Sequence, residues 1–399
     1  MLGRRARAAT AAAAVVLSAC GAPGKSLSEL TSASTTAGSS PTTPPSTTTP
    51  PATTRPEPTT SPTTAGSSST AELAASTWVP ATTNLAGMPS ECGNILLVSG
   101  RPDRDTVIAS VALHGLWATT GASESWTGLG SGGGATITNR GTSIVYDPMH
   151  PDTFWETGIY NGGGVYRTDD DGTTFRQLGD IAHVDAVSVD FSDPGRRTLV
   201  AGLHEQTGVM RSHDGGQTWT KISGTLPPGV GFTSSPFVVD SHTFLVGTNK
   251  GANAGVFRTT DDGVTWTQVF TGAVTGQPLL TSAGKLFWIV DSSGGIIGSS
   301  DGGRTWLSAA RAGTVETLAP NLVELPGGAI AAVGKQAIIA SQDEGAKWTQ
   351  IGPTMPYLPA GMTFSPARQA FYIWYYTCDS NGSNAVPADG IMRLDLRSG

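Results

Sequence analysis

The chain has 399 residues, with 31 acidic side chains (Asp and Glu), 24 basic side chains (Lys and Arg) and a formal net charge of −7. Only 14% of the residues are charged, and this acidic, weakly charged composition excludes nucleic acid as a partner, because nucleic-acid binding needs a basic surface. The length allows one large domain behind the N-terminal segments and leaves no room for a second large one.

Residues 1–20 have the pattern of a bacterial lipoprotein signal peptide. Three arginines within the first seven residues precede a short apolar stretch, 8–16, and then the sequence LSAC at 17–20. LSAC matches a lipobox, in which the cysteine is lipid-modified after cleavage. The alternatives are an ordinary secretory signal with an incidental cysteine, or a membrane span, for which the apolar stretch is too short. We expect a mature protein that begins at Cys20 and is anchored to the outer side of the bacterial cytoplasmic membrane, in the cell envelope.

Residues 21–74 are expected to form a disordered stalk. Ser, Thr and Pro make up most of residues 31–70, and such a segment has almost no apolar surface to bury. About fifty residues of flexible chain span on the order of 40 Å. The stalk would therefore hold the following domain, residues 75–399, away from the membrane surface.

An eight-residue pattern, Ser/Thr-x-Asp-x-Gly-x-Thr-Trp, recurs through this domain at intervals of 40 to 47 residues. We call its five copies the repeat turns; they are residues 168–175, 212–219, 259–266, 299–306 and 341–348. A pattern at this interval predicts a repeat fold, because one short antiparallel sheet cannot bury its apolar face without a neighbour.

Each repeat turn is expected to close a hairpin. The Asp can accept hydrogen bonds from backbone N–H groups two or three residues further on, and the Gly two places later can take a positive φ. The final aromatic residue is expected to pack between neighbouring sheets. We assign the repeated aspartates to structure, because a residue present in every unit cannot mark one unique site. The aspartates are Asp170, Asp214, Asp261, Asp301 and Asp343, and the aromatic residues are Phe175, Trp219, Trp266, Trp306 and Trp348.

Seven pairs of short β-rich segments predict the blades of an all-β fold, a single β-propeller. With one strand leading into each repeat turn and one leaving it, every unit becomes a four-stranded meander. Seven blades fit best, and six or eight remain possible. The pairs are 95–99 with 106–112, 143–147 with 153–159, 186–191 with 198–203, 236–239 with 243–247, 279–281 with 286–290, 322–325 with 329–333, and 362–364 with 370–377.

The two ends of the domain are expected to close the ring. The first unit carries a degenerate repeat, 119–126, with Gly121 in place of the Asp, and the last unit has no repeat turn. Residues 76–80 are expected to supply the missing fourth strand of the last blade, which removes an exposed sheet edge. Cys92 and Cys378 would lie on one face of adjacent blades, in a compartment that permits disulfides, and we expect them to pair.

The repeat turns resemble the Asp-box, or bacterial neuraminidase repeat, of sialidases, sortilin-type receptors, xyloglucan hydrolases and photosystem II assembly factors. Because those proteins perform unrelated tasks, the resemblance implies a scaffold and no particular activity. Sialidases also carry a Phe-Arg-Ile-Pro segment, which this chain lacks. Xyloglucan hydrolases, similar to this chain around residues 146–172, place their catalytic carboxylates between two propellers, and this chain has one.

Propellers usually bind ligands on the face formed by the loops between the second and third strands of each blade. On this face we expect a polar mouth suited to an envelope protein, a peptide or a glycan, with no cofactor and no metal. The candidate residues are His114, Glu156, Tyr160, His204, Glu205 and Lys250.

Three functions compete. The favoured one is a lipid-anchored monomer that binds a partner without catalysis. The first alternative is a sialidase-like or other glycoside hydrolase, which would need two carboxylates chosen from residues such as Glu156, Glu205 and Asp291. The second alternative is a purely structural envelope lipoprotein.

Overall fold

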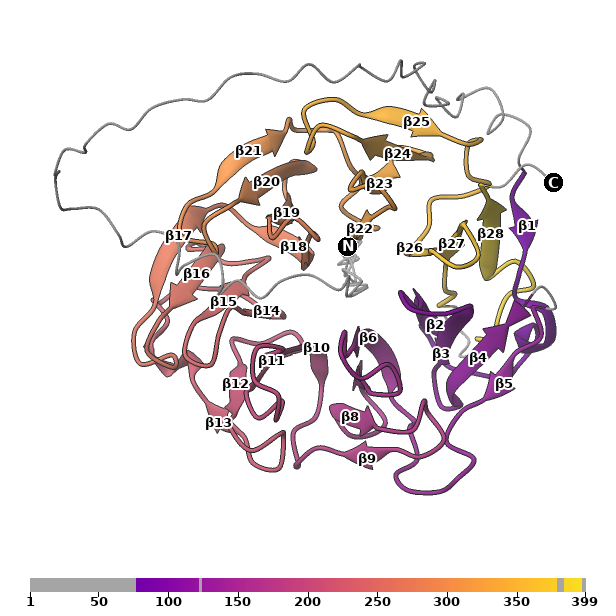
Figure 1. Cartoon of the computed structure of the whole chain (residues 1–399), viewed down its shortest axis with the longest axis horizontal. Helices are drawn as coiled ribbons and strands as arrows, with labels where there is room; N and C mark the ends of the chain where they lie inside the picture. The colour runs from indigo at the N-terminus through magenta and orange to yellow at the C-terminus, as the bar shows by residue number, and fades with distance from the viewer. Residues whose placement is uncertain (1–76, 122–123, 379–383, 397–399) are drawn as a thin grey trace, which may run out of the picture.

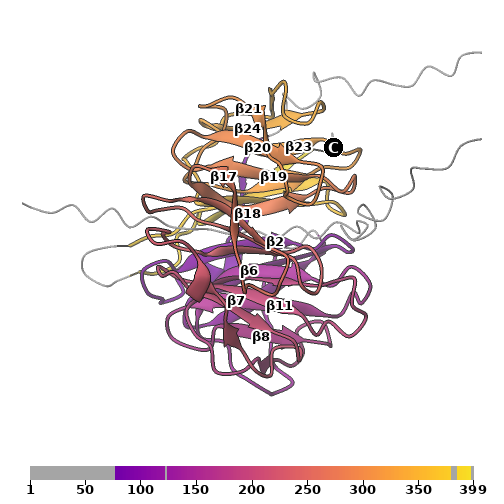
Figure 2. The ribbon, with the colours of Figure 1, turned by 90° about the vertical axis from the view of Figure 1, so that its left-hand side faces the viewer.

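The described chain forms seven four-stranded antiparallel sheets arranged in a ring, as Figures 1 and 2 show. The computed structural model describes residues 77–121, 124–378 and 384–396. The predicted signal peptide, Cys20 and the stalk lie outside the described residues. The prediction of one β-propeller with seven blades is confirmed.

Each blade is a meander whose first strand lies nearest the centre of the ring and whose fourth strand lies outermost (Figure 1). Blade 1 contains β2 (Ile95–Gly100), β3 (Thr106–Val111), β4 (Gly115–Thr120) and β5 (Thr127–Gly128). Blade 2 contains β6 (Arg140–Tyr146), β7 (Phe154–Ile159), β8 (Val165–Thr168) and β9 (Arg176–Gln177). Blade 3 contains β10 (Val184–Val189), β11 (Leu199–Leu203), β12 (Val209–Ser212) and β13 (Thr220–Lys221).

The remaining blades follow in the same order. Blade 4 contains β14 (Ser235–Val238), β15 (Phe244–Gly247), β16 (Gly255–Thr259) and β17 (Thr267–Thr271). Blade 5 contains β18 (Val274–Leu280), β19 (Leu286–Val290), β20 (Gly295–Ser299) and β21 (Leu307–Ala310). Blade 6 contains β22 (Leu322–Glu324), β23 (Ile330–Gly334), β24 (Ala337–Ser341) and β25 (Thr349–Ile351). Blade 7 contains β26 (Gly361–Ser365), β27 (Ala370–Trp374), β28 (Ile391–Asp395) and β1 (Val79–Pro80).

In the part of the chain that the structure describes, two short 3-10 helices, η3 (Thr83–Leu85) and η5 (Ser223–Thr225), lie outside the sheets. Within the described ranges, the chain contains no helix with the length and apolar character needed to cross a membrane.

Burial depends on the position of a strand within its blade. All six residues of β2 and all six of β3 are buried, because the inner strands contact a neighbouring blade on each face. Both residues of the outermost strand β13 are exposed. One apolar cluster fills each interface between neighbouring blades, so the core is a ring of seven wedges.

The aromatic residues that end the repeat turns pack into these interfaces. Phe175 is buried between blades 1 and 2. The four tryptophans are half-buried, each at the interface between its own blade and the preceding blade; they are Trp219, Trp266, Trp306 and Trp348. The Trp266 indole N–H donates to the Ile222 carbonyl of the preceding blade over 3.1 Å. Trp219 makes the equivalent bond to the Leu178 carbonyl, so these two tryptophans are both apolar wedges and hydrogen-bonded links between blades.

The aspartate of each repeat turn holds the turn through a recurring set of hydrogen bonds. Asp170 accepts one from the Thr174 backbone N–H over 2.8 Å and another from the Thr174 hydroxyl over 2.7 Å. The main backbone donor thus lies four residues further on, and not two or three as expected, because two residues with positive φ, Asp171 and Gly172, lengthen the turn. Asp214 and Asp261 repeat the same bonds.

Strands from both ends of the domain close the ring in blade 7. Strand β1 pairs antiparallel with β28, which confirms the predicted closure. A disulfide joins Cys92, before β2, to Cys378, after β27, across a sequence separation of 286 residues. This confirms the predicted pairing, and in the chain-entropy description a loop of this length contributes several kcal/mol to stability.

The degenerate repeat of blade 1 contributes a further link across the closure. Glu124, which is buried, accepts hydrogen bonds of 3.1 Å from the Arg368 guanidinium and from the Tyr372 hydroxyl, and it also pairs with Arg393. The three donors belong to blade 7. The degenerate repeat, which has Gly121 at the aspartate position, therefore connects two blades through Glu124, three residues further on.

Candidate ligand-binding face

The loops between the second and third strands of each blade lie at one end of the propeller, which we call the loop face. Loops 112–114, 160–164, 204–208 and 248–254 contribute to it from blades 1 to 4. Five of the six candidate residues lie in these loops; they are His114, Tyr160, His204, Glu205 and Lys250.

A cluster built around Tyr160 occupies the loop face at blades 2 and 3. The Tyr160 hydroxyl lies 3.2 Å from Nε2 of His204, and Nδ1 of His204 lies 2.8 Å from a carboxylate oxygen of Asp185. The Tyr160 ring meets the His183 and His204 rings edge-on, with centroids 5.2 and 5.5 Å apart. Asp185 is buried while Tyr160 is half-exposed, so a buried acid orients a histidine that in turn orients an accessible tyrosine.

The segment before β2 supports the same cluster from blade 1. The Arg140 guanidinium lies over the Tyr160 ring, 4.8 Å from its centroid, and its Nε donates to Glu91 over 2.7 Å. The Asn161 side-chain amide donates to the same Glu91 carboxylate. Both sides of Tyr160 are therefore held before any ligand arrives, which reduces the entropy cost of binding.

The charges around His204 change its protonation. Burial by itself lowers the pKa of His204, but the hydrogen bond to Asp185 and the charges of Asp185 and Glu205 outweigh it and raise the pKa above the ordinary value. Burial, with a contribution from the charge of Glu205, raises the pKa of the Tyr160 hydroxyl. The tyrosine therefore stays neutral at physiological pH and can donate or accept a hydrogen bond.

The backbone of the cluster is strained. Tyr160, Asn161, His183 and Glu205 adopt positive φ angles of 56°, 46°, 55° and 52°, which residues with a side chain rarely take. Strained conformations persist only where surrounding contacts impose them, and they concentrate at binding and catalytic sites. The strain, the orienting hydrogen bonds and the accessible aromatic ring coincide at this one place.

The other two loop candidates have separate partners. The His114 ring nitrogen Nε2 lies 2.5 Å from the Pro89 carbonyl oxygen. The Lys250 ammonium lies over the Phe232 ring, 4.7 Å from its centroid. The predicted face therefore exists as several local groups around the ring, and the Tyr160 cluster combines only Tyr160, His204 and Glu205 from the predicted set.

Glu156 does not lie in a loop, which corrects its assignment to the ligand face. It belongs to β7 and is 0% exposed, on the same side of the strand as Phe154 and toward blade 1. One carboxyl oxygen accepts from the Asn139 amide over 3.3 Å, and the other has no hydrogen-bond partner among the described residues. Burial raises the pKa of Glu156 to about 8. A ligand on the surface cannot reach this group.

Two tyrosines of the loop face escaped the sequence analysis. Tyr357 and Tyr375 lie edge-on with ring centroids 4.2 Å apart, and both hydroxyls donate to Asp389, Tyr357 to its carbonyl and Tyr375 to its carboxylate. The sequence Trp374-Tyr375-Tyr376 is typical of a strand, and the sequence pattern predicts a strand that continues to residue 377. Strand β27 ends at Trp374, so Tyr375 begins a loop.

No group of three or more His, Cys, Asp or Glu side chains in the described part of the chain has an arrangement that could hold a metal ion. The carboxylates considered for hydrolysis also belong to different blades. Glu156 lies inside blade 2, Glu205 follows β11 in blade 3, and Asp291 follows β19 in blade 5. The chemistry that the loop face offers is hydrogen bonding and aromatic contact around Tyr160.

Comparison with known proteins identifies the fold only. Neither protein-family models nor curated protein sequences match the chain. Among solved structures, the extracellular domain of a putative hybrid two-component system from B. thetaiotaomicron shares 11% identity with a TM-score of 0.52, over 76% of this chain and 40% of that one. YCF48 bound to D1 peptide shares 17% identity with a TM-score of 0.47, over 81% and 97% of the two chains. A gluconolactonase from Xanthomonas campestris shares 14% identity with a TM-score of 0.45, over 78% and 98%.

Proposed function

We propose that this chain is a lipid-anchored, extracytoplasmic propeller that binds a peptide segment of an envelope protein through its loop face, without catalysis. The observation that carries the proposal is the Tyr160 cluster. A half-exposed tyrosine is fixed by His204 at its hydroxyl and by Arg140 over its ring. Tyrosine and arginine are enriched among the residues that dominate binding energy at protein interfaces.

Aromatic side chains around the loop face extend the surface available to such a segment. Half-buried Phe232, Tyr357 and Tyr375 occupy the connections and loops of blades 4 and 7, and Tyr160 occupies blade 2. An extended peptide crossing the face would meet flat apolar rings that carry hydroxyl groups and nearby charges. This combination of apolar area and polar edges favours a peptide or a protein loop.

The tyrosine gives the first test of this function. Replacing Tyr160 with alanine should weaken the binding of peptides, selected from a displayed random library against the full chain, by about tenfold or more, because the substitution removes an oriented aromatic anchor. Affinities would be measured by calorimetry. The control is Val264→Ala, which changes a 64%-exposed apolar residue in a repeat turn at the opposite end of the propeller.

Two results would contradict the proposal. One is peptide affinity that is the same in Tyr160→Ala, Tyr375→Ala and the unmodified chain while all three proteins melt at similar temperatures. The other is turnover of fluorogenic sialosides or β-glucans by the purified chain, which would favour a hydrolase. A glycan array screened in parallel would identify a carbohydrate ligand in place of a peptide.

Membrane anchoring is tested through Cys20. Replacing Cys20 with alanine should leave the precursor unprocessed or release the protein from the membrane fraction, because the thiol that carries the lipid is lost. Fractionation and mass spectrometry of the N-terminus would measure the outcome. A Cys20→Ala protein that remained processed and membrane-bound would show that the lipobox assignment is wrong.

A further inference from the structure

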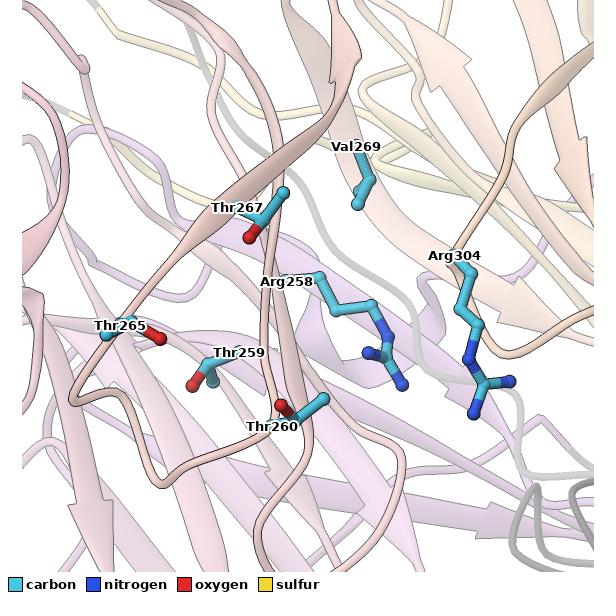
Figure 3. Close-up of a pocket in the computed structure, with 7 residues that line it drawn as sticks. All are labelled: Arg258, Thr259, Thr260, Thr265, Thr267, Val269 and Arg304. Atoms are coloured by element: carbon cyan, nitrogen blue, oxygen red, sulfur yellow. The ribbon is translucent and has the colours of Figure 1, made fainter.

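A polar pocket lies between blades 4 and 5, at the end of the propeller opposite the loop face. Its volume is about 190 Å³. Arg258 comes from β16, and Arg304 comes from the repeat turn of blade 5, residues 299–306. Figure 3 shows the two guanidinium groups at the same end of the pocket. The lining residues are Arg258, Thr259, Thr260, Thr265, Thr267, Val269 and Arg304.

Arg258 stands at a repeated position, and the two other arginines at this position are paired with acids. Arg167 and Arg211 likewise come immediately before the first residue of a repeat turn. Arg167 contacts Asp169 at 2.5 Å. Arg211 reaches the repeat turn of the next blade, where its guanidinium donates to the Asp262 carbonyl over 3.2 Å and lies 3.7 Å from the Asp262 carboxylate. In both of these blades the arginine at this position therefore lies beside a carboxylate.

The repeat turn that faces Arg258 has lost that carboxylate and gained a cation. Gly302 occupies the place that Asp262 holds in the preceding turn, and Arg258 donates from Nε to the Gly302 carbonyl over 3.3 Å. Two residues later Arg304 replaces the residue that corresponds to Val264. An arginine–aspartate pair in one interface has therefore become an arginine–arginine pair in the next.

The two cations lack a protein counter-ion in direct contact. No ion pair joins either arginine to an acid within the ranges 77–121, 124–378 and 384–396, and the two acids whose charges act on Arg258, Asp240 and Asp301, have other hydrogen-bond partners. Asp240 accepts from the backbone N–H groups of His242 and Thr243, and Asp301 accepts from Ser299 and Thr305. Burial, followed by the charge of Arg304, lowers the pKa of Arg258. Two positive charges held close together beside a partly buried pocket create a positive electrostatic potential there, which favours the binding of an anion.

The pocket also offers free hydrogen-bond donors. Arg304 uses one terminal nitrogen to reach the Asp301 carbonyl over 2.8 Å, and Arg258 uses only Nε. The hydroxyls of Thr260 and Thr267 have no hydrogen-bond partner among the described residues. Two planar guanidinium groups together with the hydroxyl groups supply more hydrogen-bond donors than the two oxygens of a carboxylate can accept. Phosphate and sulfate groups present three or four acceptor oxygens and match this set of donors better.

We propose that the pocket between blades 4 and 5 binds a tetrahedral oxyanion, a phosphate or sulfate group, between the guanidinium groups of Arg258 and Arg304. The volume admits the anionic group itself, so a larger ligand would carry it as an ester. This site lies at the other end of the propeller from the Tyr160 cluster, and it does not depend on the peptide-binding proposal.

Calorimetry and thermal melting of the full chain with inorganic phosphate and with sodium sulfate, against chloride at matched ionic strength, would test the site. We expect saturable binding and a rise in melting temperature with phosphate or sulfate. The first variant is Arg304→Val, which restores the residue type of the preceding turn. The second is Gly302→Asp, which restores the acid; Asp262 already takes a φ of 61° there, Gly302 has a φ of 71°, and the added Cβ has no neighbour closer than 3.8 Å.

Each variant should raise the dissociation constant by about tenfold or more, because it removes a charge-assisted donor or supplies a competing carboxylate. The matched control is Arg211→Gln, which alters the same repeated position where an acid is present and should leave phosphate binding unchanged. Stabilisation by chloride equal to that by phosphate, or equal binding by both variants and the unmodified chain, would overturn the proposal. Comparison of inorganic phosphate with a sugar phosphate and a sugar sulfate distinguishes a free anion from an ester as the ligand.

Discussion

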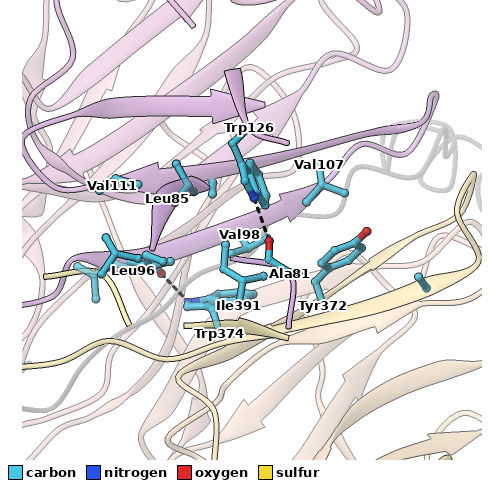
Figure 4. Close-up of a cluster of buried hydrophobic side chains, with 14 of the residues drawn as sticks. Ala81, Leu85, Leu96, Val98, Val107, Val111, Trp126, Tyr372, Trp374 and Ile391 are labelled. Carbon is cyan, nitrogen blue, oxygen red and sulfur yellow. Dashed lines mark hydrogen bonds between the residues drawn. The ribbon is translucent and has the colours of Figure 1, made fainter. Parts of the chain in front are cut away.

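Replacing Trp374 with alanine should lower the free energy of unfolding by about 3–5 kcal/mol, the typical cost of removing a large buried aromatic side chain. Trp374 ends β27 and is 0% exposed, within the cluster between blades 1 and 7 (Figure 4). Its indole N–H donates to the Leu96 carbonyl over 3.1 Å, so the substitution also leaves a buried backbone acceptor without its partner. The substitution therefore removes packing from the interface between blades 1 and 7, which closes the ring.

Two controls calibrate this effect in chemical denaturation experiments. Trp266→Ala removes a half-buried tryptophan and should cost about half as much, because less apolar surface is lost from the interface. Glu205→Ala changes an exposed loop residue and should cost about half a kcal/mol or less. Equal shifts for Trp374→Ala and Glu205→Ala would contradict the assignment of core and loop positions.

The second large effect is a dependence on pH that Glu156→Gln should abolish. Burial raises the pKa of Glu156 from an ordinary value of 4.5 to about 8. The unfolded chain therefore releases this proton near pH 4.5 while the folded chain keeps it until about pH 8. Stability is unaffected by the group below pH 4.5, falls as the pH rises through this window, and levels off above it, with a total loss on the order of a few kcal/mol.

Glutamine has nearly the same shape and no proton to lose. The unfolding free energy of Glu156→Gln should therefore be close to that of the unmodified protein at pH 4.5 and exceed it increasingly toward pH 8. Chemical denaturation of both proteins at several pH values measures the difference between their unfolding free energies. The contributions of all other titrating groups are the same in both proteins and cancel in this difference. Glu205→Gln, at an exposed site, is the control. A difference between Glu156→Gln and the unmodified protein that does not change with pH would show that Glu156 is not held neutral.

The blades were predictable because each repeat turn is encoded by residues close together in the sequence. A repeat turn needs an aspartate, a glycine and an aromatic residue within eight positions, and these produce the same hairpin in the five blades that carry a copy. The seven pairs of short β-rich segments then indicate the number of blades. Strand β1 and Cys92 were located by elimination, since a closed ring leaves one missing strand and two unpaired cysteines.

The binding surfaces depend on pairings between residues far apart in the sequence. Tyr160 and His204 are 44 residues apart, and no local pattern shows that one will orient the other. Glu156 stands one residue after a tryptophan and near a loop, and only the register of β7 against β6 and β8 places it inside the blade interface.

The same limit applies to Arg258. The sequence by itself determined that an arginine precedes the repeat turn in three blades, because that position is part of the repeat. Arg167 meets an acid of its own turn, but whether Arg211 and Arg258 meet an acid or another cation was decided only by the tertiary structure, since their partners are contributed by the next blade. Gly302 and Arg304 lie about one repeat further along the chain, and packing of blade 5 against blade 4 brings them to Arg258. Local turn chemistry builds each blade, whereas contact between blades determines which charges meet.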